Sequence, residues 1–150
     1  MSIYSIVLLL HIIAAVAELG AAFALPILMN APKTVSQAKF ALAVNEKVEK
    51  PVKIESITLL VTGIILGILS PYLFKKIWYI ASLVIYVAIQ PIVAGILPKK
   101  MARQRELLES HKGEDLPEEY TKIGKEMAPI NGLAHLSAIV LIVLMTLKPF

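Results

Sequence analysis

Four long apolar stretches divide the chain, and charged or polar residues separate them. They cover about residues 3–29, 54–74, 77–97 and 130–147. A helix needs about 20 apolar residues to cross about 30 Å of hydrocarbon, and each stretch approaches or exceeds that length. Helices are expected because lipid offers the backbone no hydrogen-bond partners. The pattern predicts an all-α fold, a four-helix transmembrane bundle that forms a single integral membrane domain over residues 1–150.

Composition agrees with a membrane location. Hydrophobic residues make up 57% of the chain, whereas soluble domains are about 45–50% apolar. The first stretch has no basic segment before it and is too long for the core of a signal peptide, so we expect it to remain as a span. The absence of cysteine excludes disulfides, thiolate metal sites and iron–sulfur clusters.

The basic residues predict the orientation. The connecting segments 30–53 and 99–129 hold twelve of the fifteen Lys and Arg residues. The positive-inside rule places both segments in the cytoplasm and both chain ends outside, in a bacterial inner membrane. The net charge of +4 does not indicate nucleic-acid binding, because the basic residues gather in these two loops. The expected partner is the lipid bilayer.

The two cytoplasmic loops are predicted to be amphipathic and helical. Thr34 is a suitable cap for a helix that continues to Lys50, and we expect Pro51 to interrupt it before the second span. Further helices are expected over 101–112 and from Asp115 in a capping box. They are predicted either to lie on the lipid headgroups or to form a solvated hairpin.

The polar residues inside the spans are the candidate functional groups, because each is costly in hydrocarbon. From span boundaries and a rise of 1.5 Å per residue, four of them come out at about 18–22 Å from the outer surface. These four are Glu18, Thr62, Gln90 and His135. His11 and Tyr86 are predicted about 12–13 Å deep. The interpretation without a function is that these groups only satisfy one another, for example in a Glu18–His135 pair.

Two further features concern packing. Gly63 and Gly67 form a GxxxG pair that favours close approach of another helix, for which the alanine-rich first span is the expected neighbour. The same motif also fits a homo-oligomer. Gln90 precedes Pro91, which is predicted to bend the third span.

Three functional hypotheses follow. The first is a redox module that binds haem b, with His11 and His135 as iron ligands from two helices. The second is a proton-coupled or small-solute transport component that uses Glu18 and His135 as proton-exchanging groups and the bent third span as its binding site. The third is a membrane-anchored helper or sensor that binds a cytoplasmic partner through residues 30–53 and 99–129. Whether the protein is an enzyme stays open, but no hydrolase or phosphate-binding motif is present.

Four segments resemble a family of small bacterial integral membrane proteins that is catalogued as a domain of unknown function. They are His11–Phe23, Thr34–Leu42, Thr58–Gly67 and the basic ending Pro98–Lys100. The resemblance implies a four-helix membrane protein and names no chemistry. A looser similarity to the four-helix membrane domains of b-type cytochromes and copper-resistance proteins implies roles as ligands for His11 and His135 alone.

Overall fold

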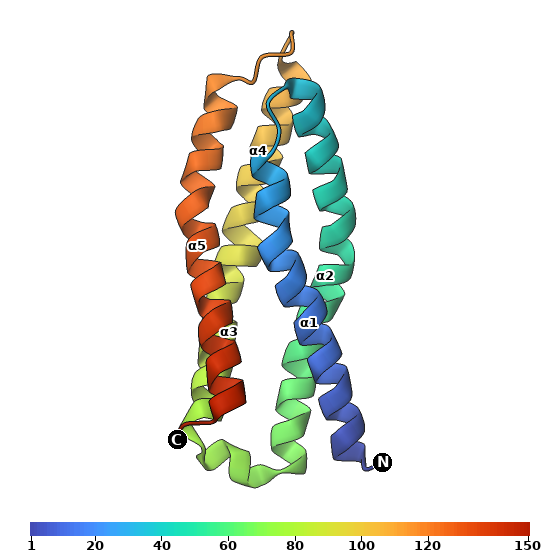
Figure 1. Ribbon diagram of the computed structural model, residues 1–150, viewed down its shortest axis with the longest axis vertical. Helices are drawn as coiled ribbons and strands as arrows, with labels where there is room; N and C mark the ends of the chain where they lie inside the picture. Colours follow the sequence, from blue (N-terminus) through green and yellow to red (C-terminus); the bar gives the residue numbers. More distant parts are fainter.

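The computed structural model describes residues 1–150 and contains only helices and short connections. Its elements are α1 (Ile3–Asn30), α2 (Val35–Leu69), the 3-10 helix η1 (Pro71–Lys75), α3 (Ile77–Pro91), the π-helix η2 (Ile92–Ile96), α4 (Leu97–Ser110) and α5 (Glu118–Leu147). α3, η2 and α4 follow one another without a break, so the bundle has four long rods (Figure 1). All four are long and apolar enough to cross a membrane. The predicted four-helix transmembrane bundle is confirmed.

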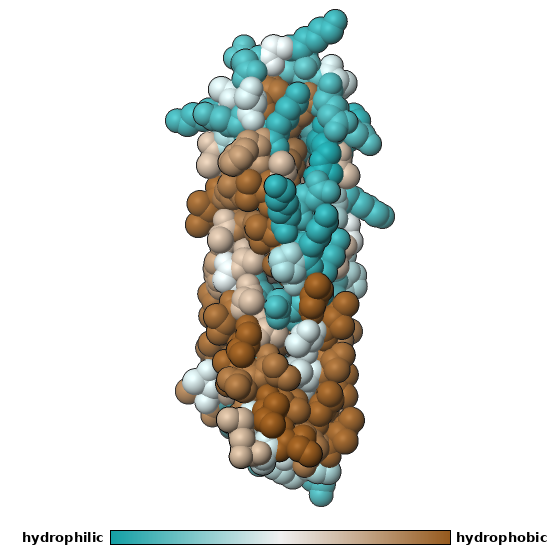
Figure 2. All heavy atoms as spheres, turned by 90° about the vertical axis from the view of Figure 1, so that its right-hand side faces the viewer, coloured by the Kyte–Doolittle hydropathy of each residue, from teal (hydrophilic) through white to brown (hydrophobic).

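The two ends of the bundle differ. Both chain termini and η1 lie at one end, which we call the terminal end, and the α1–α2 and α4–α5 loops lie at the other, which we call the basic end (Figure 1). On the face that Figure 2 shows, apolar side chains cover the terminal half and polar side chains gather toward the basic end. Among the large apolar side chains that are exposed, only Phe40 lies outside the four apolar stretches and the chain ends. This is the surface that a bilayer requires of a helical bundle.

The connecting helices differ from the prediction in two ways. Pro51 does not interrupt the helix, because α2 continues through it from the basic end to the terminal end. A proline inside a helix costs one backbone hydrogen bond and bends the axis, but it need not end a helix that is packed on both sides of it. The helices of the predicted loops continue the transmembrane rods instead of lying flat (Figure 1).

The two loops at the basic end hold each other. Thr34 caps α2, since its hydroxyl accepts a hydrogen bond of 3.2 Å from the Gln37 amide. Glu114 of the other loop accepts at its carbonyl from the Val35 amide at 2.9 Å and at its carboxylate from the Ser36 hydroxyl at 2.8 Å. Asp115 forms a β-bridge with Thr34 and caps no helix, so the predicted capping box is wrong.

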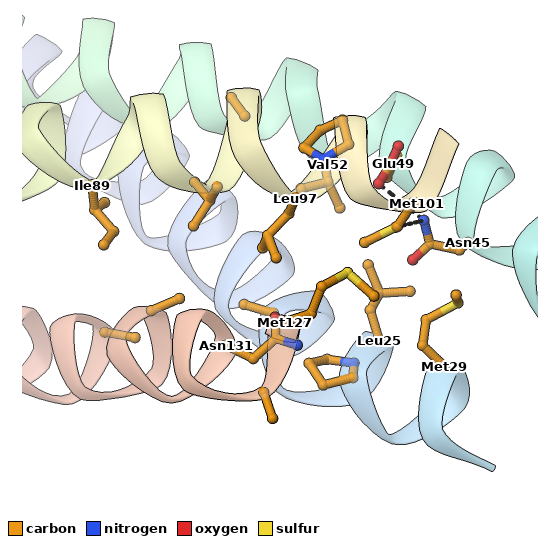
Figure 3. Close-up of a pocket in the computed structure, with 18 of the residues that line it drawn as sticks. Leu25, Met29, Asn45, Glu49, Val52, Ile89, Leu97, Met101, Met127 and Asn131 are labelled. Atoms are coloured by element: carbon orange, nitrogen blue, oxygen red, sulfur yellow. Dashed lines mark hydrogen bonds between the residues drawn. The ribbon is translucent and has the colours of Figure 1, made fainter. Parts of the chain in front are cut away.

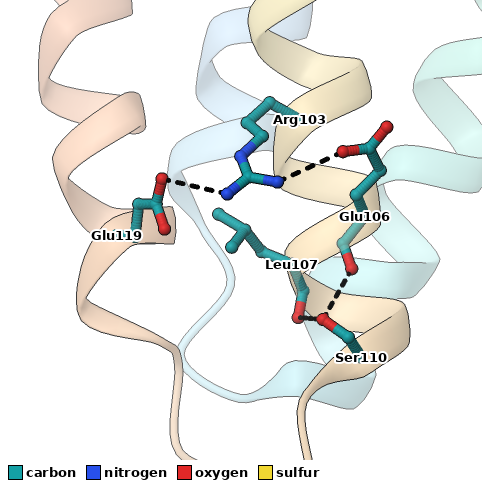
Figure 4. A network of polar contacts seen from close by, with 5 residues as sticks. All are labelled: Arg103, Glu106, Leu107, Ser110 and Glu119. Atoms are coloured by element: carbon teal, nitrogen blue, oxygen red, sulfur yellow. Dashed lines mark hydrogen bonds and ion pairs between the residues drawn. The ribbon is translucent and has the colours of Figure 1, made fainter.

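Ion pairs join the rods near the basic end. The Arg103 guanidinium lies 3.2 Å from a carboxylate oxygen of Glu106 and 3.3 Å from one of Glu119, which ties α4 to α5 (Figure 4). Lys100 and Glu126 form a second pair between the same helices at 3.0 Å. Such exposed pairs contribute about 0–1 kcal/mol each. They fix the register of α4 and α5 and add little to the stability.

Candidate functional site

The polar side chains of the spans separate into three groups. Glu18 bonds to α2 and α3, His11 bonds to α2, and His135 bonds to α1. The Glu18–His135 pair considered from the sequence is therefore not formed, because each side chain has its own partner. His11 and Glu18 both contact α2, so they lie on one face of α1, as their spacing of seven residues requires.

The Glu18 carboxylate is held by two hydroxyl groups. Ser56 of α2 donates a hydrogen bond of 2.6 Å to Glu18 Oε1. The Tyr86 hydroxyl of α3 lies 2.9 Å from Glu18 Oε2, and it lies 3.0 Å from the Ser56 carbonyl oxygen. Three helices therefore meet at one carboxylate. We call Glu18, Ser56 and Tyr86 the carboxylate cluster.

The depths predicted from the sequence separate Tyr86 from Glu18 by one or two helical turns. The structure instead brings the two side chains into contact. α1 runs obliquely across α2, so each residue of α1 advances less than 1.5 Å along the bundle axis (Figure 1). The Glu18 side chain also leans toward the N-terminus of its helix, which is the direction of Tyr86. Ser56 was missed because it lies at the boundary of the second apolar stretch.

His11 belongs to the contact between α1 and α2. Its Nδ1 lies 2.8 Å from the Thr62 hydroxyl, and Thr62 donates its own hydrogen to the Thr58 carbonyl at 2.6 Å. Nδ1 of His11 is then the donor, since the Thr62 hydroxyl has only one hydrogen. A Cβ on Gly63 would lie 3.3 Å from the His11 ring, so the glycine leaves room for the imidazole.

His135 ties α5 to α1. Its Nε2 lies 2.8 Å from the Ala22 carbonyl oxygen, and its ring stacks on Phe23 with the centroids 4.7 Å apart. A carbonyl oxygen only accepts, so Nε2 carries the hydrogen in this arrangement. The ring therefore satisfies the Ala22 carbonyl, to which Pro26, four residues on, has no N–H to donate, and this is a structural role.

The two histidines belong to different helix contacts, and neither lines the large cavity described next. Each imidazole uses one ring nitrogen to join a pair of helices, and a histidine that ligates a metal commonly bonds to the protein through its other nitrogen in this way. The haem hypothesis stays a prediction, which an absorption spectrum of purified protein tests through the Soret band.

A cavity of about 670 Å³ lies between the α1–α2 pair and the rods that contain α4 and α5. Of its 35 lining residues, 19 are hydrophobic, so the wall is mainly apolar with several polar groups (Figure 3). In the close-up, the side chains of Leu25, Leu97 and Met127 point into the space between the helices (Figure 3). The volume lies within the range of about 300–1,000 Å³ that is usual for small-molecule sites.

The cavity begins at the carboxylate cluster and extends to the basic end. Glu18, Ser56 and Tyr86 line its inner part, and Asn45, Gln104 and Tyr120 line the part near the loops. Gln90 and η2, the π-helix that follows Pro91, also face it. π-helical turns occur frequently at functional sites. The part of the third span where the sequence predicts a bend, at Gln90, is thus part of the cavity wall.

Asn45, Gln104 and Tyr120 were not among the predicted site residues. They belong to segments that were expected to lie on the membrane surface or in water, where polar residues need no explanation. The one signal was the apolar face Tyr120, Ile123 and Met127, all three of which are buried. That face indicated packing of the segment, but not a cavity beside it.

Comparisons with known proteins agree with the fold. A family model described as a predicted integral membrane protein (DUF2269) matches residues 5–149. The match confirms the resemblance to a family of small integral membrane proteins. No curated protein and no solved structure matches the chain.

Proposed function

Because this chain belongs to the DUF2269 family of integral membrane proteins, we propose that it binds a small amphiphilic molecule in the cavity between its helices, as a component of small-solute transport. The observation that carries the proposal is the cavity of about 670 Å³ with its mainly apolar wall. Cavities of this size with a few polar groups are the usual form of small-molecule sites.

A cavity-filling substitution tests the proposal. Ala134 of α5 lines the cavity, whereas its neighbour Leu133 is 46% exposed on the outer surface. Native mass spectrometry of detergent-purified protein is expected to show a retained lipid-like molecule. Ala134→Phe is expected to lose it, and the matched control Leu133→Phe is expected to keep it. A wild-type protein that carries and takes up no amphiphile, or equal retention by both variants, would contradict the proposal.

A second function, proton exchange at Glu18, is favoured by the hydrogen bonds of the carboxylate cluster. With Glu18 ionised, Ser56 and Tyr86 both donate to it, and the Ser56 carbonyl receives no hydrogen from Tyr86. With Glu18 protonated, its own hydrogen can pass to the Tyr86 oxygen, and Tyr86 can donate to the Ser56 carbonyl. The same three side chains thus accommodate both protonation states, as a proton carrier requires.

Liposomes that contain a pH-sensitive dye test this second function. Proton flux through the reconstituted wild-type protein is expected to fall in Glu18→Gln, because the amide cannot exchange the proton. Glu109→Gln is the control, since Glu109 is exposed on α4, outside the apolar stretches, and makes none of the hydrogen bonds of the cluster. Unchanged flux in Glu18→Gln would remove Glu18 as the carrier.

We extend the proposal to the orientation, with the basic end in the cytoplasm of a bacterial cell and both chain ends outside. The asymmetry of Lys and Arg supports it. Because the chain has no cysteine, single-cysteine variants report the sides directly. A membrane-impermeant maleimide added to intact cells is expected to label Ser2→Cys and to leave Lys112→Cys unlabelled. The reverse pattern would contradict this orientation.

A further inference from the structure

Three buried polar atoms at the basic end of the cavity have no hydrogen-bond partner in the chain. They are Asn45 Oδ1, Gln104 Oε1 and the Tyr120 hydroxyl oxygen. Their residues are only 3%, 2% and 5% exposed, they come from α2, α4 and α5, and all three line the cavity. Buried polar groups in native proteins almost always have a hydrogen-bond partner, so three buried polar atoms without one at the same end of the cavity need an explanation.

The two amide groups are oriented by partners that only accept hydrogen bonds. Asn45 Nδ2 donates to a Glu49 carboxylate oxygen at 2.9 Å and to the Met101 sulfur at 3.3 Å (Figure 3). Gln104 Nε2 donates to the Tyr120 backbone carbonyl at 3.2 Å. An amide turned the other way would place two acceptors against each other. The free atom of each amide is therefore its carbonyl oxygen, which accepts hydrogen bonds.

A continuous set of contacts keeps the three groups at one end of the cavity. Asn45 touches Met101, Gln104 follows Met101 by one helical turn of α4, and Gln104 bonds to the backbone of Tyr120. Residues three apart on a helix are about 5–6 Å apart on its surface. Together the three side chains present two acceptors and one hydroxyl, and a hydroxyl can donate or accept.

We infer that this group, which we call the amide–tyrosine subsite, binds the head of the amphiphile, and that this head is uncharged and carries at least two hydroxyl groups. The inference rests on the proposed function and adds the chemistry of the ligand. A diol matches the subsite, because its two O–H groups donate to Asn45 and Gln104 while one of its oxygens accepts from Tyr120. The acyl chain then lies along the apolar wall toward the carboxylate cluster.

The charges around the subsite support a neutral head. An anionic head would bring its oxygens against two carbonyl oxygens that have no hydrogen to give. The cavity wall also contains both signs of charge, with Glu18, Glu49 and Lys53 on the side of α1 and α2 and Lys125 on α5. A cationic or anionic head would therefore meet a like charge on one part of the wall.

Three probes with a similar long, singly unsaturated hydrocarbon chain test the inference by native mass spectrometry titration. They are 1-monooleoylglycerol, which has a diol head, its 2,3-di-O-methyl ether, which keeps the oxygens but has no donor, and oleylamine, which is cationic. The diol is expected to bind about three- to tenfold more tightly than the ether, the range that one net hydrogen bond supplies. Tighter binding of oleylamine than of the diol would overturn the neutral head.

Tyr120→Phe is the sharpest variant, because the hydroxyl that it removes makes no bond within the chain. It is expected to keep or raise the melting temperature while it lowers the affinity for 1-monooleoylglycerol about three- to tenfold. Tyr72→Phe is the matched control, since Tyr72 is 60% exposed at the terminal end. Gln104→Met is a second variant, which is expected to narrow the preference for the diol over the ether.

The outcomes separate the two levels of the proposal. Equal binding of the diol and the ether by the wild-type protein would show that water satisfies the three atoms, which overturns the subsite and leaves the cavity as a binding site. Unchanged diol affinity in Tyr120→Phe and an unchanged preference in Gln104→Met would overturn it as well. Binding of none of the three probes would instead contradict the proposed function itself.

Discussion

The terminal half and the basic half of the bundle treat their buried polar groups differently. In the terminal half, Thr62 bonds to His11 and the Tyr79 hydroxyl donates to the Gly63 carbonyl at 2.8 Å, both between helices. In the basic half, three buried side chains each keep one polar atom without a partner.

The spacing of the helices explains this difference. In the terminal half, glycines bring the backbones close enough for side chains to reach a neighbouring carbonyl: Gly63 lies under the His11 ring and Gly67 lies under Tyr79. In the basic half, the helix pairs stand apart around the cavity. Close packing thus serves stability in one half, and incomplete packing leaves room for a ligand in the other.

The largest loss of stability is expected from a side chain that fills the space beside Gly67. A Cβ there would lie 2.8 Å from Phe74 Cζ and 2.9 Å from Tyr79 Cζ, and closer still to the Tyr79 hydroxyl. Gly67→Ala is therefore expected to destabilise the protein by about 1–3 kcal/mol, measured by unfolding in detergent. Gly132→Ala is the control, since a Cβ at Gly132 meets nothing within 4 Å. Equal stability of the two variants would show that the terminal half is not closely packed.

A smaller difference in stability is expected between a variant that removes a hydrogen-bonded polar group and one that removes a polar group without a partner. Thr62→Val removes the partner of the His11 Nδ1 hydrogen, so it is expected to cost about 1 kcal/mol. Tyr120→Phe removes a buried hydroxyl without a partner, so it is expected to leave stability unchanged or to raise it. Both are compared by thermal unfolding without added amphiphile. A loss of stability in Tyr120→Phe that matches Thr62→Val would contradict the difference between the halves.

The smallest effect is expected at the ion pair of Lys100 and Glu126, outside the apolar stretches. The hydrogen bond and the charge of Lys100 lower the pKa of Glu126 in the folded protein. The pair therefore contributes stability above the pKa of the unfolded state, and that contribution is lost as the pH falls through the lowered folded pKa. Glu126→Gln is expected to remove this small pH dependence, which is measured by unfolding at pH values around and below the ordinary glutamate pKa of about 4.3. An identical profile in the variant would show that the pair contributes nothing.

The fold could be predicted because length and apolarity decide it. Each stretch had to cross the lipid as a helix, whatever its detailed sequence, and the predicted stretches 3–29 and 130–147 lie within α1 and α5. The prediction that Pro51 interrupts the helix before the second span is wrong. The proline's local cost of one hydrogen bond is outweighed by the packing of α2 on both sides.

The site could be predicted only in part. Glu18 stands out because an acidic residue in an apolar stretch is costly, and it lies in the carboxylate cluster. Its hydrogen-bond partners depend on the tilt of α1 and on the length and direction of the Tyr86 side chain. Neither can be calculated from the spacing of residues along the chain. Asn45 and Gln104 could not be recognised, because their burial results from the packing of α2, α4 and α5 and not from the polarity of their own segments.

The most direct test of the central claim is an experimental structure of the protein purified in its native lipid. The account predicts elongated density in the cavity, with a polar head beside Asn45, Gln104 and Tyr120 and an apolar chain that runs toward Glu18 and Tyr86. Helices α1 and α2 packed directly against α4 and α5, with no space between their side chains, would contradict it.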